Sequence, residues 1–208
     1  MVSVSAVRPH DLVRMASGGR LASSGAPSWV IESLRAAPWA VARRATAAPG
    51  HVAVGVRGPT RGQRFALEVP MAAVRGIVTP EELVARTRPA DSGLPALRAL
   101  RAVAPSLNRI GLPWGPVGSV GFELATGIAA VTPSSDLDLV IRSATLPSPE
   151  VLFRVLGVLR SLPARPDCLI ETREGAVALA ELVSGAGEVL LRTAGGPRLI
   201  RVQRQAVA

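Results

Sequence analysis

The sequence predicts a mixed α/β protein of the α+β type, with a small N-terminal α+β domain (1–88) and a second domain in which helices cover a mixed sheet (89–208). Helical and strand-like apolar patterns alternate along the second half, which is typical of a sheet covered by helices. The segment RTRPADSG (86–93) is charged and contains Pro and Gly, as boundaries between domains often do. With 208 residues, 48% of them hydrophobic, the chain is long enough for two small cores or one large one.

One helix and three strands are expected in the first half. Apolar residues recur at helical spacing in PSWVIESLRAA (27–37), and Pro38 ends that helix. WAVARRA (39–45) and HVAVGVRG (51–58) alternate or cluster small apolar residues as strands do. RFALEVP (64–70) follows the turn-forming GPTRG, and we expect it to pair with the strand before that turn.

The second half is expected to alternate helices and strands up to its end. Its first helix, LPALRALRAVAPSLNRI (94–110), contains Pro105 and is expected to be interrupted or kinked there, because proline removes a helical hydrogen bond. SVGFELAT (119–126) is expected to form a helix that Gly127 closes. The other elements, in chain order, are a short strand and turn at 112–119, a strand from 136 to 142, a helix at 149–162, a strand at 167–172, a helix at 175–185 and a final strand or hairpin at 188–202.

The chain is strongly basic. Its 24 basic residues are all arginines, against 15 acidic residues, which gives a formal net charge of +9. A GC-rich genome would favour this composition, and so would anion binding, since guanidinium groups bind phosphate and carboxylate through paired hydrogen bonds. The chain has no Tyr, three Phe and three Trp, which leaves few rings for stacking nucleic-acid bases. We therefore expect a phosphorylated small molecule or an acidic protein as partner, rather than nucleic acid.

Nothing in the sequence indicates a membrane or secreted protein. Arg, Pro or Gly interrupt each apolar segment before it reaches the roughly 20 residues that span a bilayer. The start, MVSVSAVRPHDLV, lacks a charged region followed by an uninterrupted apolar stretch. The single cysteine, Cys168, excludes an internal disulfide and, with only two histidines, argues against a zinc site. We expect a cytoplasmic protein with no membrane partner.

Two aspartates stand at the start of an apolar strand in SSDLDLVIR (134–142). Alternate side chains of a strand face the same way, so Asp136 and Asp138 share one face while the leucines point to the other. Two carboxylates this close repel each other unless a cation lies between them, and Mg²⁺ prefers such hard oxygen ligands. The alternative is an ordinary solvated start of a strand, because Asp-x-Asp also arises by chance.

Two further features favour the metal interpretation. Asp167 opens the strand DCLIET and can reach the same edge of the sheet as a third carboxylate. Gly118 and Ser119 stand at the start of a helix, where backbone N–H groups bind phosphate and a glycine allows close approach. Ser119 could instead be an ordinary helix N-cap. Taken together, a phosphate-binding helix start and three carboxylates that hold a metal ion indicate an enzyme of nucleotidyl transfer.

The same residues carry a resemblance to a known family. Gly118-Ser119 followed by SDLDL is similar to the signature of the nucleotidyltransferase superfamily. The strings GPVGSVGFELATG, VTPSSDLDLVIR and GAVALAEL resemble one branch of it, the phosphoribosyl-dephospho-CoA transferase (holo-acyl-carrier-protein synthase) of malonate decarboxylase. RPHDL, APWAVARRA and GVRGPTRGQRFA extend the resemblance into the first half. The C-terminal end, RLIRVQRQAVA, departs from the family pattern, so no role is assigned to residues after Arg198.

The resemblance implies a nucleotidyltransferase-like second domain and a specific reaction. Such enzymes transfer phosphoribosyl-dephospho-CoA from 2'-(5''-triphosphoribosyl)-3'-dephospho-CoA to a serine of the apo acyl carrier protein, and pyrophosphate leaves. Asp136 and Asp138 match the metal-binding pair, with Mg²⁺ expected and Mn²⁺ as an alternative. Gly118 and Ser119 match the phosphate-binding turn. Asp167 matches the third carboxylate only through its place at the start of a later strand, and it is the candidate to accept the serine proton.

Five arginines of the first half are candidates for binding the donor phosphates or docking an acidic carrier protein: Arg43, Arg44, Arg57, Arg61 and Arg64. Each could equally belong to a solvated strand face. Two other functions stay open. A different nucleotidyltransferase, which adenylylates a protein or small molecule from ATP, would use the same glycine, serine and aspartates. A non-catalytic nucleic-acid-binding protein would explain the charge but not the clustered aspartates.

Overall fold

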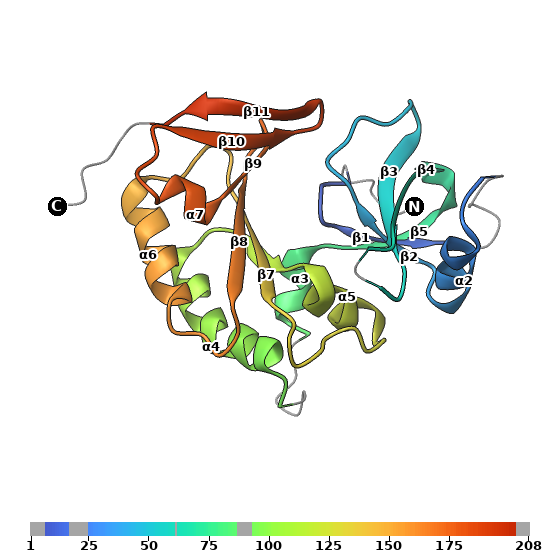
Figure 1. The fold of residues 1–208 in the computed structure, drawn as a ribbon, viewed down its shortest axis with the longest axis horizontal. Coiled ribbons are helices and arrows are strands. Elements are labelled where there is room, and N and C mark those ends of the chain that lie inside the picture. The colour runs from blue at the N-terminus through green and yellow to red at the C-terminus, as the bar shows by residue number, and fades with distance from the viewer. Residues whose placement is uncertain (1–6, 17–24, 61, 87–92, 203–208) are drawn as a thin grey trace. The chain divides into compact units, whose positions relative to one another are not determined.

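The computed structural model describes residues 7–16, 25–60, 62–86 and 93–202. The fold is α+β, as predicted, and its two sheets are open (Figure 1). The chain divides into two compact units, of which the first ends at Thr79 and the second begins at Pro80. Most of the expected boundary segment, 87–92, lies outside the described residues.

The first unit is built on a five-stranded antiparallel sheet in the order β4-β3-β2-β1-β5. The predicted helix and three strands are confirmed, and β3 and β4 form a continuous hairpin across GPTRG. α2 buries Val30 and Leu34 in the core of this unit. The elements are β1 (Leu12–Met15), α2 (Ser28–Ala36), β2 (Trp39–Ala42), β3 (His51–Arg57), β4 (Arg64–Pro70), a 3-10 turn (Met71–Ala73) and β5 (Val74–Val78).

The second unit is built on a six-stranded mixed sheet in the order β11-β10-β9-β8-β7-β6. β7 and β8 run parallel, and the other neighbouring strands pair antiparallel. The elements are α3 (Pro80–Val84), α4 (Pro95–Ile110), β6 (Trp114–Pro116), α5 (Gly118–Thr126), β7 (Leu137–Arg142), α6 (Pro149–Leu159), β8 (Pro166–Glu171), β9 (Ala176–Ala178), α7 (Leu179–Leu182), β10 (Glu188–Thr193) and β11 (Gly196–Arg201).

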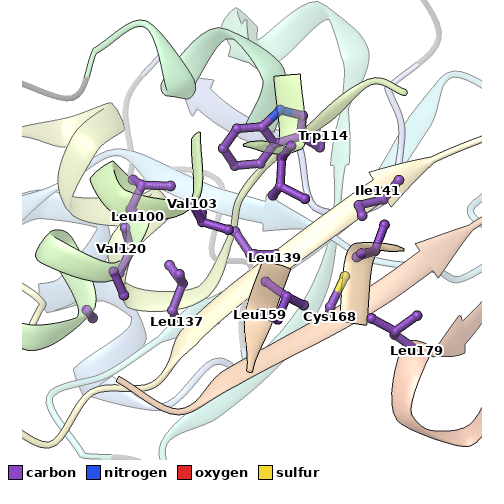
Figure 2. Close-up of a cluster of buried hydrophobic side chains, with 14 of the residues drawn as sticks. Leu100, Val103, Trp114, Val120, Leu137, Leu139, Ile141, Leu159, Cys168 and Leu179 are labelled. Atoms are coloured by element: carbon purple, nitrogen blue, oxygen red, sulfur yellow. The ribbon is translucent and has the colours of Figure 1, made fainter. Parts of the chain in front are cut away.

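A helical layer covers one face of this sheet. Because side chains alternate along a strand, those that do not point towards the helices lie on the opposite face. α6 connects the parallel strands β7 and β8 and packs beside α4 (Figure 1). Leu137, Leu139 and Ile141 alternate along β7 and point into the core that the helices form (Figure 2). Cys168 of β8 joins the same core. The residues between them on β7 and β8 therefore face away from this core.

Two expected helices differ from the observed elements. α4 runs from Pro95 to Ile110 without interruption, because Pro105 lies on its exposed side and removes only one backbone hydrogen bond. The prediction of a helix at 175–185 is wrong for its first residues. There β9 pairs with β8, and only the short α7 follows. No helix within the described ranges is long and apolar enough to cross a membrane.

Candidate active site

The start of β7 and the start of β8 bring two aspartates together. Asp138 and Asp167 are register partners on these parallel strands, and their neighbours Leu139 and Cys168 are register partners that point into the core. Asp138 and Asp167 therefore project side by side from the opposite face, on strands about 4.8 Å apart. Asp138 is half-buried and Asp167 is exposed, so the pair lies at the surface of the second unit.

Asp136 directly precedes β7, at the same end of the sheet. The N–H of Leu137 donates to the carbonyl of Arg165 at 2.9 Å, so the backbone is already paired with the segment before β8 immediately after Asp136. Alternation along an extended chain would put Asp136 on the face of Asp138. All three predicted carboxylates thus belong to one end of the β7–β8 pair.

These residues fit a magnesium ion that substrate phosphates help to hold. The described residues contain no group of three or more His, Cys, Asp or Glu side chains assembled as a metal site. Mg²⁺ is usually held in proteins by one or two carboxylates together with water and substrate phosphates, however. Asp138 and Asp167 supply such a pair in register, with Asp136 two residues before Asp138 in the chain. A full set of protein ligands is not needed for this type of site.

Gly118, the first residue of α5, lies against the carboxylate of Asp138. Its φ of +62° is a left-handed conformation that favours glycine. A Cβ at this position would overlap Oδ2 of Asp138 and would lie 2.9 Å from its Cγ. The N–H of Val117 also donates to the backbone carbonyl of Asp138 at 2.9 Å. The predicted phosphate-binding turn and the predicted metal ligand are therefore in direct contact.

Ser119 does not cap α5. The helix begins at Gly118, and the capping position belongs to Val117, whose side chain cannot accept a hydrogen bond. Within the described part of the chain no side chain caps the start of this nine-residue helix. The expectation that Ser119 could be an ordinary N-cap is therefore wrong. The half-buried Ser119 lies in the first turn, where N–H groups point out of a helix end and attract anions.

The loop from α5 to Asp136 is fixed by side-chain hydrogen bonds that the sequence analysis missed. Glu123 of α5 accepts hydrogen bonds on Oε2 from the N–H groups of Ala130 (2.7 Å) and Val131 (2.8 Å). A turn from Thr132 to Ser135 then leads directly to Asp136. A glutamate inside a helix normally indicates only a solvated face, so the local sequence carried no signal for this contact.

A buried ion pair, also missed, supports the same region. Nη1 of Arg142 donates to both carboxylate oxygens of Glu81, at 3.0 and 2.9 Å. The Arg142 side chain is only 7% exposed. It lies on the same strand face as Asp138, four positions further along β7. Because Glu81 belongs to α3, which packs on β6 and α5, the pair fixes the α3–α5 layer to β7.

Cys168 has no role in this chemistry. Its side chain is buried among apolar residues on the helical side of the sheet (Figure 2). Burial, with a smaller contribution from the negative charge of Asp167, raises the pKa of the Cys168 thiol to about 12. A thiol with this pKa is neither a nucleophile nor a ready metal ligand near neutral pH.

Two of the five predicted arginines of the first unit are paired by the sheet register. Arg57 and Arg64 are register partners at the end of the β3–β4 hairpin, where both are exposed. Arg43 lies beyond β2, with its aliphatic carbons beside Gly55. Arg44 follows Arg43 directly, and Arg61 lies outside the described residues.

Two family models together match most of the chain. The phosphoribosyl-dephospho-CoA transferase MdcG N-terminal domain matches residues 8–80, and the C-terminal domain of the same family matches residues 83–203. The chain belongs to the MdcG family. All five predicted site residues of the second unit, from Gly118 to Asp167, fall within the match to the MdcG C-terminal domain.

Curated members of the MdcG family are similar to this chain over nearly their whole length. A protein of Pseudomonas aeruginosa named phosphoribosyl-dephospho-CoA transferase is 41% identical over 92% of this chain and 91% of its own length. Proteins of the same name from Pseudomonas putida GB-1 and Azotobacter vinelandii are each 41% identical, and cover 95% and 93% of this chain and 95% and 92% of their own lengths. No solved structure matches the chain.

Proposed function

We propose that this chain is a phosphoribosyl-dephospho-CoA transferase that modifies the apo acyl carrier protein of malonate decarboxylase. The donor is triphosphoribosyl-dephospho-CoA, the acceptor is a serine of the carrier, and the second product is pyrophosphate. The observation that carries the proposal is the contact between Gly118 and the Asp138 carboxylate, with Asp167 in register beside it. A turn suited to phosphate thus adjoins a carboxylate pair suited to a divalent cation.

The helix start holds the triphosphate of the donor. N–H groups of the first turn of α5 donate to phosphate oxygens, the Ser119 hydroxyl adds a further donor, and Gly118 lets the phosphates approach the backbone. Asp136, Asp138 and Asp167 would hold Mg²⁺ or Mn²⁺. When bound, the cation neutralises charge on the phosphates and on the departing pyrophosphate.

The transfer itself needs little covalent help from the protein. The serine oxygen of the carrier forms a bond to the phosphorus nearest the ribose, and the bond from that phosphorus to pyrophosphate breaks. Asp167 is exposed at the edge of the site and accepts the serine proton, if it lies within hydrogen-bond reach of the hydroxyl. The rate comes mainly from positioning and from neutralising charge.

In this proposal, the first unit supplies positive charge that attracts the donor or the carrier protein. Arg57 and Arg64 form an exposed basic pair that fits donor phosphates or acidic groups of the carrier protein. Complementary charge of this kind accelerates encounter more than it adds affinity. We place the reaction in the cytoplasm, in keeping with the free thiol of Cys168.

Mass measurement of the carrier tests the proposal directly. The protein is incubated with the apo carrier, triphosphoribosyl-dephospho-CoA and Mg²⁺, and the carrier should gain the mass of one phosphoribosyl-dephospho-CoA group. A carrier whose acceptor serine is replaced by alanine is the control and should gain nothing. A parallel reaction with ATP as donor tests the rival adenylylation. If ATP modifies the carrier and the dephospho-CoA donor does not, the proposed donor is wrong.

A further inference from the structure

Glu123 connects the phosphate-binding helix to the loop that carries Asp136. It is the sixth residue of α5, five residues after Gly118, and its side chain is half-buried. A single carboxylate oxygen accepts hydrogen bonds from two consecutive backbone N–H groups, those of Ala130 and Val131, at 2.7 and 2.8 Å. Bonds to a charged acceptor at these distances are among the stronger hydrogen bonds in proteins.

After this contact, core packing and a hydrogen-bonded turn hold the loop up to Asp136. Val131 is 8% exposed and packs in the core of the second unit. The N–H of Thr132 donates to Oγ of Ser135 at 2.9 Å, and the N–H of Ser135 donates to the carbonyl of Thr132 at 3.0 Å. This turn ends one residue before Asp136, so the position of Asp136 depends on where the loop is held.

Asp136 needs such support more than Asp138 does. Asp138 lies within β7, where it is the register partner of Asp167 on β8 and its backbone carbonyl accepts a hydrogen bond from the N–H of Val117, so its backbone is fixed on the sheet. Asp136 precedes the first strand residue, Leu137. On either side of Asp136, the described backbone hydrogen bonds are those of Leu137, which pairs with Arg165, and of Ser135 in the preceding loop. A fixed loop therefore decides whether the Asp136 carboxylate joins that of Asp138.

We propose that Glu123 is a positioning residue that holds the 128–135 loop so that Asp136 is presented to the divalent cation. The inference rests on the proposed function, in which Asp136 and Asp138 hold that cation. It adds a residue that touches neither the donor nor the metal. Through Glu123, the same helix that begins with the phosphate-binding turn also aligns a metal ligand.

The experiment measures binding of Mn²⁺ to the full chain, with paramagnetic resonance detecting the free ion. Glu123→Ala should raise the Mn²⁺ dissociation constant about tenfold or more, since loss of a group that orients a metal ligand typically costs 10- to 100-fold in affinity. Glu123→Gln keeps a carbonyl oxygen that can accept both N–H groups and should bind within about twofold of the unmodified protein. Amide hydrogen exchange should accelerate at 130–136 in the alanine variant only.

Glu181 provides a matched control. It is also a partly exposed glutamate on a helix, its Oε2 accepts the N–H of Leu190 at 2.8 Å, and its Oε1 accepts from Arg192 at 3.3 Å, on a strand that β9 separates from β8. Glu181→Ala should destabilise the fold while leaving Mn²⁺ affinity unchanged. If Glu123→Ala does not fold, Glu123→Asp replaces it, because the shorter side chain keeps the charge but does not reach both N–H groups.

The outcomes separate this inference from the proposed function. If the unmodified protein binds no Mn²⁺, both the metal assignment and the inference fail. If it binds Mn²⁺ and Glu123→Ala or Glu123→Asp binds equally well, only the inference fails. Equal weakening by Glu123→Ala and Glu181→Ala would also overturn it, because general destabilisation would then account for the effect.

Discussion

A single methyl group at Gly118 should disturb the proposed metal site as well as the backbone. The φ of +62° there costs an alanine roughly 1–2 kcal/mol, because Cβ crowds the backbone in the left-handed conformation. The same Cβ would overlap Oδ2 of Asp138, so the carboxylate must turn away. An off-rotamer side chain adds about 0.5–1.5 kcal/mol. We therefore expect Gly118→Ala to lower the free energy of unfolding by about 1.5–3.5 kcal/mol and to weaken Mn²⁺ binding.

Gly127 is the matched control for this substitution. It closes the same helix with a φ of +73°, and a Cβ there would have no neighbour within 4 Å. Gly127→Ala should therefore show the backbone cost alone and should bind Mn²⁺ normally. The difference between the two variants isolates the overlap with Asp138.

Urea unfolding and Mn²⁺ titration of both variants provide the assay. The reasoning would be refuted by a Gly118→Ala protein that matches Gly127→Ala in both stability and Mn²⁺ affinity. This outcome would mean that the turn can relax away from Asp138 at no cost. Weaker donor binding alone would place the obstruction at the phosphates instead, as a simple phosphate-binding turn would predict.

Asp136→Asn and Asp138→Asn should each abolish carrier modification with an unchanged circular dichroism spectrum; near-normal turnover by both would contradict the metal assignment. Ser119→Ala should lower donor affinity in calorimetry roughly ten- to more than a hundredfold, the equivalent of about 1.5–3 kcal/mol, with less than about 0.5 kcal/mol lost from stability because Ser119 is not a cap. The raised pKa of Cys168, about 12 against an ordinary 9.0, contributes stability below pH 9 that is lost as the pH rises towards 12. At pH 8 iodoacetamide should therefore alkylate Cys168 only in urea, and alkylation of the folded protein would contradict this burial.

The sequence predicted those helices and strands whose apolar residues repeat over enough positions to show a helical or strand period. α2, β3, β4 and α6 lie within the expected ranges, since each has a clear apolar period. β1 has four residues and α3 has five, too few for a period to show. β9 was mistaken for helix because a run of small apolar residues suits both states, and its pairing with β8 decides between them.

The residues of the candidate site were likewise predictable where a local pattern marks them and not where a distant contact does. Asp136, Asp138, Gly118 and Ser119 were selected from a short pattern in which spacing carries the chemistry. The register of Asp138 with Asp167 depends on the parallel pairing of β7 and β8, which the intervening helix suggested but did not establish. Glu123 gave no local signal, because its partners follow seven and eight residues later across a loop.

The close approach of Gly118 to Asp138 also bears on how donor and cation can bind. A phosphate at the start of α5 lies near the carboxylate of Asp138, and two like charges at that distance repel. A divalent cation between them reverses the sign of this interaction. Under the proposed function, tight donor binding therefore requires the cation, and linkage requires the donor to raise the affinity for the cation by the same factor. Under that proposal, the contact of turn and carboxylate couples binding of the donor to binding of the cation.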